Sequence, residues 1–256
     1  MEKKMYVFIV AVLTLGACAQ QPPKQAPIIT DADVKQYVQS DLGKAFMSDS
    51  FKFMQPLLDS ILLDDQRYRL GGDAKRFRAH LSEQMVLDSI NIIRLKTIVK
   101  EYGWLGFKQI GVRSAHLYNV LLHIVKKEDW DYFLPVAMNG YCKGSLASSG
   151  LFGFIDRYLK ARRELQLFGT EIVSTDTKGQ SILYPIYAPL QLEQRWMKYG
   201  SGIFKYPPYI KSNYQIQWDA AAHERNLLLQ VHLLSVDTGT ATINKILLWM
   251  DSCKNK

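Results

Sequence analysis

The apolar residues of this chain recur mainly at intervals of three and four positions, which is the period of an α-helix. The pattern runs through residues 33–43, 56–70 and 73–102, and a break of the last stretch near Ser82 is an open alternative. Pro56 suits a first helical turn and Gly103 a C-terminal cap. Further helices are predicted over residues 111–126, 129–142, 150–165, 187–199, 217–235 and 239–252. We therefore expect a mainly α fold, a multi-helix and bundle-like domain.

One stretch departs from the helical period. Residues 167–174 and 180–186 are short runs of apolar and β-branched residues, separated by the turn-forming sequence Asp176-Thr177-Lys178-Gly179. Two such runs around a turn are typical of a β-hairpin. We expect one small hairpin near residues 167–186.

The first residues have the form of an export signal. Lys3 and Lys4 precede the apolar run 5–15, and the small residues Gly16 and Ala17 stand directly before Cys18. The run is too short for a permanent membrane span, which needs about 20 apolar residues. This segment is similar to the lipobox of bacterial lipoproteins. The resemblance implies removal of residues 1–17 and attachment of acyl chains such as palmitate at Cys18.

The resemblance also bears on localisation and domain organisation. Ala19 stands where an aspartate would retain a lipoprotein of enteric bacteria in the inner membrane. It therefore implies an outer-membrane lipoprotein that faces the periplasm. Residues 18–29 are rich in proline and glutamine and predict a flexible tether. We expect a helical domain over residues 30–206 and a C-terminal helical pair, residues 207–256, packed on the same domain.

If Cys18 carries lipid, two cysteines remain. Cys142 and Cys253 could pair in an oxidising envelope, and closing a loop of about 110 residues would stabilise the fold by roughly 4–5 kcal/mol. Two buried free thiols are the alternative, and a single sequence favours them.

Composition and charge narrow the class of partner. With 48% hydrophobic residues the chain can form a core, which excludes general disorder. The net charge is +8, and basic clusters occur at residues 75–78, Lys126-Lys127 and Arg162-Arg163. In an envelope such clusters would meet anionic envelope components or an envelope protein, not nucleic acid. Solvated helix faces are the plainer interpretation.

Several common catalytic motifs are missing. The sequence has no phosphate-binding glycine loop, no His-Glu-x-x-His, no Cys-x-x-Cys and no Gly-x-Ser-x-Gly. His116 and His123 are two helical turns apart, about 10 Å, which is too far for both to hold one ion together with Asp129 and Asp131. We therefore predict neither a cofactor nor a metal site.

Short polar motifs follow one another in a distinctive order along residues 57–200. They are Asp65-Gln66-x-x-Arg69, Asp88-x-x-Asn91, Tyr102-Gly103-Trp104, Gly111-x-x-Ser114-Ala115, His123, Asp129-x-Asp131, Asp156-Arg157, Gln166-x-Phe168-Gly169-Thr170-Glu171, Pro185 and Arg195-x-x-x-Tyr199-Gly200. Together they resemble the bacterial domain-of-unknown-function family 6624, which has no settled activity. Two departures stand out, since Leu122 and Glu171 occupy positions where that family has glutamine.

These motifs supply the candidate polar site. Its members are Asp65, Gln66, Arg69, Asp88, Asn91, His123, Asp129, Asp156, Arg157, Gln166, Thr170 and Glu171. In a shared desolvated pocket the pKa values of the carboxylates would be forced apart, giving an acid and a base beside His123. A buried network that only holds helices in register needs the same residue types. Asp88 and Asn91 share a helix face with apolar residues, so they are either exposed or buried and hydrogen-bonded.

Two functions follow from these patterns. The first is a membrane-anchored envelope lipoprotein with a binding or scaffolding domain. The alternative is an acid/base hydrolase that acts on a cell-wall or glycan substrate through an Asp/His cluster. An open pocket shared by His123, Asp65 and Asp88 would favour the hydrolase. Asp65 and Asp156 paired with arginines and sealed from solvent would exclude it.

Overall fold

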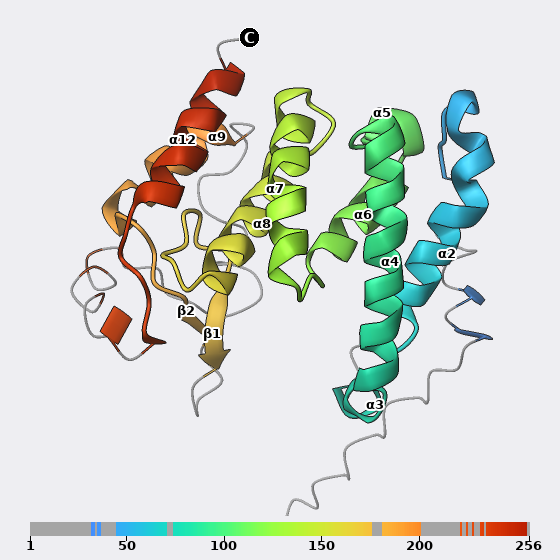
Figure 1. Ribbon diagram of the computed structural model, residues 1–256, viewed down its shortest axis with the longest axis horizontal. Coiled ribbons are helices and arrows are strands. Elements are labelled where there is room, and N and C mark those ends of the chain that lie inside the picture. The colour runs from blue at the N-terminus through green and yellow to red at the C-terminus, as the bar shows by residue number, and fades with distance from the viewer. Residues whose placement is uncertain are drawn as a thin grey trace, which may run out of the picture.

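The computed structural model describes residues 45–70, 74–175, 181–200 and 234–254, with isolated residues between 32 and 36 and between 221 and 232. In these ranges it is a mainly α, multi-helix domain, as the hydrophobic period predicts (Figure 1). The predicted signal peptide, Cys18, the tether, the turn of the hairpin and most of the helices expected over 33–43 and 217–235 lie outside the described residues.

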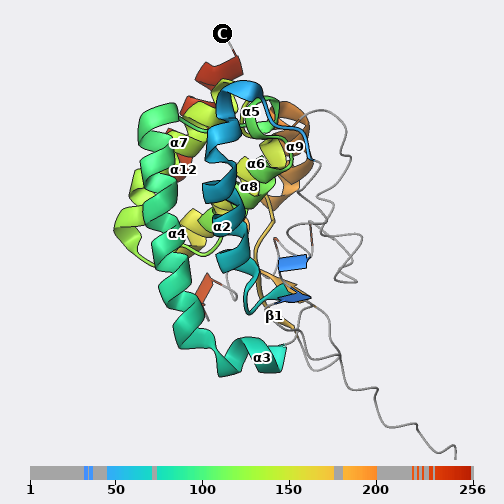
Figure 2. The same cartoon turned by 90° about the vertical axis from the view of Figure 1, so that its right-hand side faces the viewer.

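The elements form an elongated array. Their bounds are η1 Asp49–Met54, α2 Gln55–Gln66, α3 Ala74–Ala79, α4 Leu81–Tyr102, α5 Phe107–Ile110, α6 Arg113–Leu121, α7 Lys127–Cys142, α8 Ser148–Ala161, β1 Ile172–Thr175, β2 Ser181–Leu183, η3 Pro189–Gln191, α9 Leu192–Tyr199 and α12 Ala241–Lys254. Figure 1 shows α2 and α4 at one end of the long axis, α12 at the other, and α6, α7 and α8 between them. Helices α2 and α4 pack side by side (Figure 2).

Local sequence explains several helix ends. Pro56 lies in the first turn of α2, where its missing N–H is not needed. Gly103 ends α4 with φ 71°, and its N–H bonds to the carbonyl of Val99. Glycine adopts this left-handed conformation at little cost, so the predicted cap is confirmed.

The helix expected over 111–126 was predicted too long. Helix α6 ends at Leu121, and Lys126 is already extended at the start of α7. The reason is tertiary, because the carbonyl of Leu122 accepts a hydrogen bond from Arg157 and His123 turns toward Asp65. The helical period of the sequence gives no information on tertiary partners such as Arg157 and Asp65.

The hairpin is present but shorter than expected. Strands β1 and β2 pair antiparallel, with an irregularity between Ile172 and Ser174. Residues 167–170 were expected in the first strand, which was wrong for a physical reason. The backbone N–H groups of Leu167, Phe168 and Thr170 bind the side chain of Asp156 instead of a partner strand.

The two remaining cysteines are joined. Cys142 ends α7 and Cys253 lies on α12, and their Cα atoms are 4.9 Å apart in a disulfide. The preference for free thiols was therefore wrong. Helix α12 packs against α7, which brings together two residues that are 111 positions apart.

One continuous apolar cluster fills the space between the elements. Its aromatic centre joins α8, the following loop and α9, with Phe152 stacked on Phe168 at 3.9 Å and Trp196 edge-on to Phe152 at 4.8 Å between ring centroids. Because interiors pack densely, this cluster fixes the loop that follows α8. The polar groups described below lie at the edges of this core.

Candidate functional site

The predicted site residues do not form one pocket. The structure divides most of them between two polar groups, one on α2 and α4 and one on α8 and its following loop. The first holds Asp65, Gln66, Arg69, Asp88, Asn91 and His123, and the second holds Asp156, Arg157, Gln166, Thr170 and Glu171. Asp129 belongs to neither hydrogen-bond network: it pairs with Lys96 and lines one pocket together with Asp88 and His123.

Arg69 is the centre of the first group. Its Nη1 and Nη2 donate to the two carboxylate oxygens of Asp88 at 2.8 and 2.6 Å, and Nη1 lies 3.3 Å from Asp65 Oδ1. Gln84 also donates to Asp88, at 2.9 Å. Asp88 and Asn91 are buried and hydrogen-bonded, and not exposed, which decides between the two possibilities for this helix face. Asn91 donates to the carbonyl of Ile61 and thereby ties α4 to α2.

Sequence reasoning missed three members of this network. Gln84 is fully buried and donates to the carbonyl of Asp64, and Arg94 donates to the carboxylate of Asp64 at 2.7 Å. A signal was present, since Gln84 precedes Asp88 by one helical turn and Asp64 adjoins Asp65. These bonds hold α2 and α4 in register. This is the purely structural role that stands as the alternative to a polar site.

His123 faces the first group from the turn after α6. Its Nδ1 lies 2.8 Å from Asp65 Oδ1, an ion pair when the imidazole is protonated, although the N–H is not aligned for a regular hydrogen bond. Burial raises the pKa of Asp65, but the contacts with His123, Arg69 and Gln66 outweigh it and hold that pKa below its ordinary value. Asp65 is therefore ionised and faces Nδ1 of His123, which leaves Nε2 as the nitrogen for a ligand.

A pocket of about 230 Å³ opens beside this group, and we call it the His123 pocket. His123 and Asp88 line it, together with Lys96, Lys126 and Asp129. Asp65 lies behind His123 and is only 2% exposed. Both carboxylates that line the pocket are paired, since Arg69 holds Asp88 and Lys96 holds Asp129. An open pocket shared by His123, Asp65 and Asp88 would favour a hydrolase. The structure places His123 and Asp88 in such a pocket, but it buries Asp65.

Asp65, Asp88 and His123 also form a possible cation cluster. Each offers one ligand atom, and these atoms lie within 4.8 Å of one another. Arg69 already places its guanidinium on both carboxylates. A metal ion would have to displace that charge, so the geometry describes an arginine-centred ion-pair network and not a prepared metal site.

Asp156 is the centre of the second group. It is fully buried, and its two oxygens accept bonds from the backbone N–H groups of Leu167, Phe168 and Thr170 and from the Thr170 hydroxyl, at 2.7–2.9 Å. Burial raises the pKa of Asp156 to about 6, against these hydrogen bonds, which lower it. The carboxylate with a raised pKa thus lies inside the fold and shapes a loop.

The rest of the second group supports the same loop. Gln166 bonds to the backbone of Glu171 through both its donor and its acceptor. Glu171 accepts from Arg157 and Lys160, each at 2.9 Å. Arg157 also donates to the carbonyl of Leu122 at 2.6 Å. This bond connects the two groups, because it fixes the residue directly before His123.

A second pocket, of about 330 Å³, lies across Val125 from the first. It contains Lys127, Arg162 and Arg163 beside the aromatic rings of Trp130 and Tyr158, and we call it the basic pocket. Its carboxylate, Asp131, accepts from the Tyr158 hydroxyl at 3.2 Å and lies 3.6 Å from Arg162.

Arg163 takes an unusual backbone conformation in the basic pocket. Its φ is 60°, in the left-handed region that non-glycine residues rarely adopt. Its N–H bonds to the carbonyl of Lys160, and its carbonyl accepts from the N–H of Asp237. The surrounding chain thus imposes this conformation and holds an exposed guanidinium at the pocket.

None of the helices in the described ranges has the length and apolar character needed to cross a membrane. Comparison of the chain with protein-family models, with curated proteins and with solved structures finds no match.

Proposed function

We propose that this protein is a lipid-anchored lipoprotein of the cell envelope whose helical domain binds an anionic envelope component. The sequence around Cys18 supports the anchor, and its resemblance to a lipobox with Ala19 after the cysteine favours the outer membrane, facing the periplasm. The basic pocket supports the choice of ligand.

One observation carries this proposal. The clusters Lys126-Lys127 and Arg162-Arg163 are far apart in the sequence, yet Lys127, Arg162 and Arg163 line one pocket. Three cations line it with Asp131, and Arg162 also pairs with Glu164 at 2.9 Å. The two carboxylates leave an excess of one positive charge, with Lys127 and Arg163 as the cations that meet a ligand. Arginine binds phosphate and carboxylate oxygens with two parallel hydrogen bonds, and envelope lipids and lipopolysaccharide present such groups.

A binding experiment tests the ligand. Full-length protein is titrated with phosphatidylglycerol vesicles, phosphatidylcholine vesicles and lipopolysaccharide. We expect binding to the anionic ligands that weakens as salt is added. Each cation near an anionic surface contributes about 1 kcal/mol, so Lys127→Gln combined with Arg163→Gly should weaken binding roughly 30-fold.

The variants are chosen to preserve the fold. Glycine accepts the φ of 60° at residue 163, so Arg163→Gly removes the charge without adding backbone strain. Lys108→Gln is the matched control, because Lys108 is an exposed lysine on α5 that lines neither pocket. Equal affinities of the double variant and the control would refute the anion site.

The anchor has a separate test. Mass spectrometry of the native product should find residues 1–17 removed and acyl chains on Cys18. The Cys18→Ser variant should leave the membrane fraction. An unmodified Cys18 thiol in a correctly exported protein would contradict the anchor and leave the ligand proposal standing.

Acid/base hydrolysis of a cell-wall or glycan substrate is a second candidate, favoured by the contact of Asp65 with His123 Nδ1. An ionised carboxylate behind an imidazole prepares Nε2 as a general base. It ranks second because Asp65 and Asp156 are both sealed from solvent, and the guanidinium of Arg69 already occupies the carboxyl groups of Asp65 and Asp88. Cleavage of soluble cell-wall fragments that stops in His123→Gln would place it first, and no cleavage by the native protein would exclude it.

A further inference from the structure

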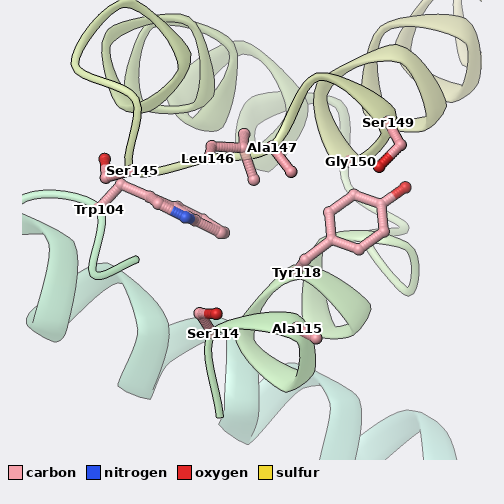
Figure 3. Close-up of a pocket in the computed structure, with 9 residues that line it drawn as sticks. All are labelled: Trp104, Ser114, Ala115, Tyr118, Ser145, Leu146, Ala147, Ser149 and Gly150. Atoms are coloured by element: carbon pink, nitrogen blue, oxygen red, sulfur yellow. The ribbon is translucent and has the colours of Figure 1, made fainter. Parts of the chain in front are cut away.

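A third pocket lies away from the ionic groups. It is about 180 Å³ in volume and is formed by α6, the start of α8 and the segments before them, and it shares no residue with the His123 pocket or the basic pocket. Figure 3 shows the lining side chains around a common hollow. They are Trp104, Ser114, Ala115, Tyr118, Ser145, Leu146, Ala147, Ser149 and Gly150, and we call this the hydroxyl pocket.

The lining has a consistent chemistry. It contains three serine hydroxyls and two large aromatic rings, and no Asp, Glu, Lys, Arg or His. Ser114 and Ser145 donate their hydroxyl hydrogens to the carbonyls of Gly111 and Gly140, at 2.9 and 3.0 Å. Their oxygens therefore keep lone pairs that accept from a ligand hydroxyl. A charged ligand would find no counter-charge here.

The start of α8 adds donors to the same space. Its N-cap is Ala147, whose methyl side chain has no acceptor for the first backbone N–H groups, so no side-chain capping bond is made. The first turn of a helix leaves such N–H groups without partners inside the helix. Ser149 and Gly150 belong to this turn and line the pocket. The N–H donors of the helix start and the serine acceptors therefore lie around the same pocket.

Two glycines leave room for the aromatic side chains that line the pocket. A Cβ atom at Gly140 would lie 2.9 Å from Trp104 Cβ, and one at Gly153 would lie 2.3 Å from the Tyr118 hydroxyl oxygen. Neither ring could hold its place beside a larger residue. In Figure 3 the indole and the phenol stand on opposite sides of the hollow. The pocket is thus walled by fixed rings and lined by hydroxyls.

We propose that the hydroxyl pocket binds one uncharged sugar ring, as at the end of an envelope glycan. A pyranose presents apolar C–H faces to aromatic rings and hydroxyl groups at its rim, which matches the walls and the serines. Pockets for drug-sized ligands are roughly 300–1,000 Å³, so this smaller volume fits a single ring. The sugar-binding inference uses neither the anion site nor the lipid anchor, and only the choice of an envelope glycan rests on the proposed localisation.

The experiment is a nuclear magnetic resonance titration of the full-length protein with methyl β-glucoside, methyl N-acetyl-β-glucosaminide and glucuronate. We expect saturable shifts of the Trp104 indole and the Ser149 and Gly150 amides. The dissociation constant should be on the order of millimolar for so small a ligand. Glucuronate should bind at least about tenfold more weakly, because its carboxylate has no cation to meet.

Ala147→Asp separates binding from stability. An aspartate N-cap bonds the free N–H groups of α8 and suits the helix dipole, so the Tm should rise or stay unchanged. The same bond removes donors from the ligand and adds a negative charge, so sugar affinity should fall about tenfold or more. Ser252→Ala, an exposed serine on α12, is the control and should keep native affinity. Unsaturable shifts, equal binding of glucuronate, or native affinity in Ala147→Asp would each overturn the proposal.

Discussion

Replacing Asp156 by alanine is expected to lower the free energy of unfolding by about 3–5 kcal/mol. The change leaves the N–H groups of Leu167, Phe168 and Thr170 without their acceptor inside the fold. A buried donor without a partner costs about 1–3 kcal/mol. Urea unfolding followed by circular dichroism measures the effect. Asp49→Ala, at an exposed ion pair with Lys52, should not shift the midpoint, and an equally small shift for Asp156→Ala would contradict this role.

The same carboxyl predicts a pH dependence. Burial raises the pKa of Asp156 to about 6, whereas the ordinary value is 3.8. The folded state therefore binds this proton more tightly than the unfolded state. The resulting stabilisation is fully present below about pH 4 and is lost as the pH rises through about 6, and it amounts to something on the order of 3 kcal/mol. Unfolding curves between pH 4 and 7 should show this loss in the native protein and not in Asp156→Asn.

Reduction of the Cys142–Cys253 disulfide is the second large effect. The bond links residues 111 positions apart, and the loop-entropy model gives about 4–5 kcal/mol for a loop of this length. Urea midpoints with and without a reductant measure the loss. The Cys142→Ser, Cys253→Ser double variant should match the reduced native protein and should not respond to the reductant. A native midpoint that is indifferent to reductant would mean that the two thiols are not joined.

The sites could be predicted from sequence only in part. The motif residues Asp65, Arg69, Asp88 and His123 do come together, because Asp65 lies in the last turn of α2, Arg69 lies four positions later in the turn after it, and the other two reach them from neighbouring elements. Asp156 was expected in the same cluster but serves a different loop. Nothing in its spacing distinguishes a carboxylate that faces a pocket from one that accepts backbone N–H groups.

The pockets were less predictable than the polar groups. Lys126-Lys127 and Arg162-Arg163 were visible as clusters, but a sequence holds no information on whether two exposed faces meet. Ser145, Ser149 and Ala147 carried no signal at all, since their role depends on the ring of Tyr118 and on an uncapped helix start.

The chain's own sequence determined its helices, the cap at Gly103 and the place of the hairpin, because helical period and turn chemistry are local properties. Tertiary structure alone decided which polar groups share a pocket, where α6 ends and whether Cys142 meets Cys253. The physical reason is that a buried donor or charge takes whichever partner the packed core brings near, and sequence distance does not restrict that choice.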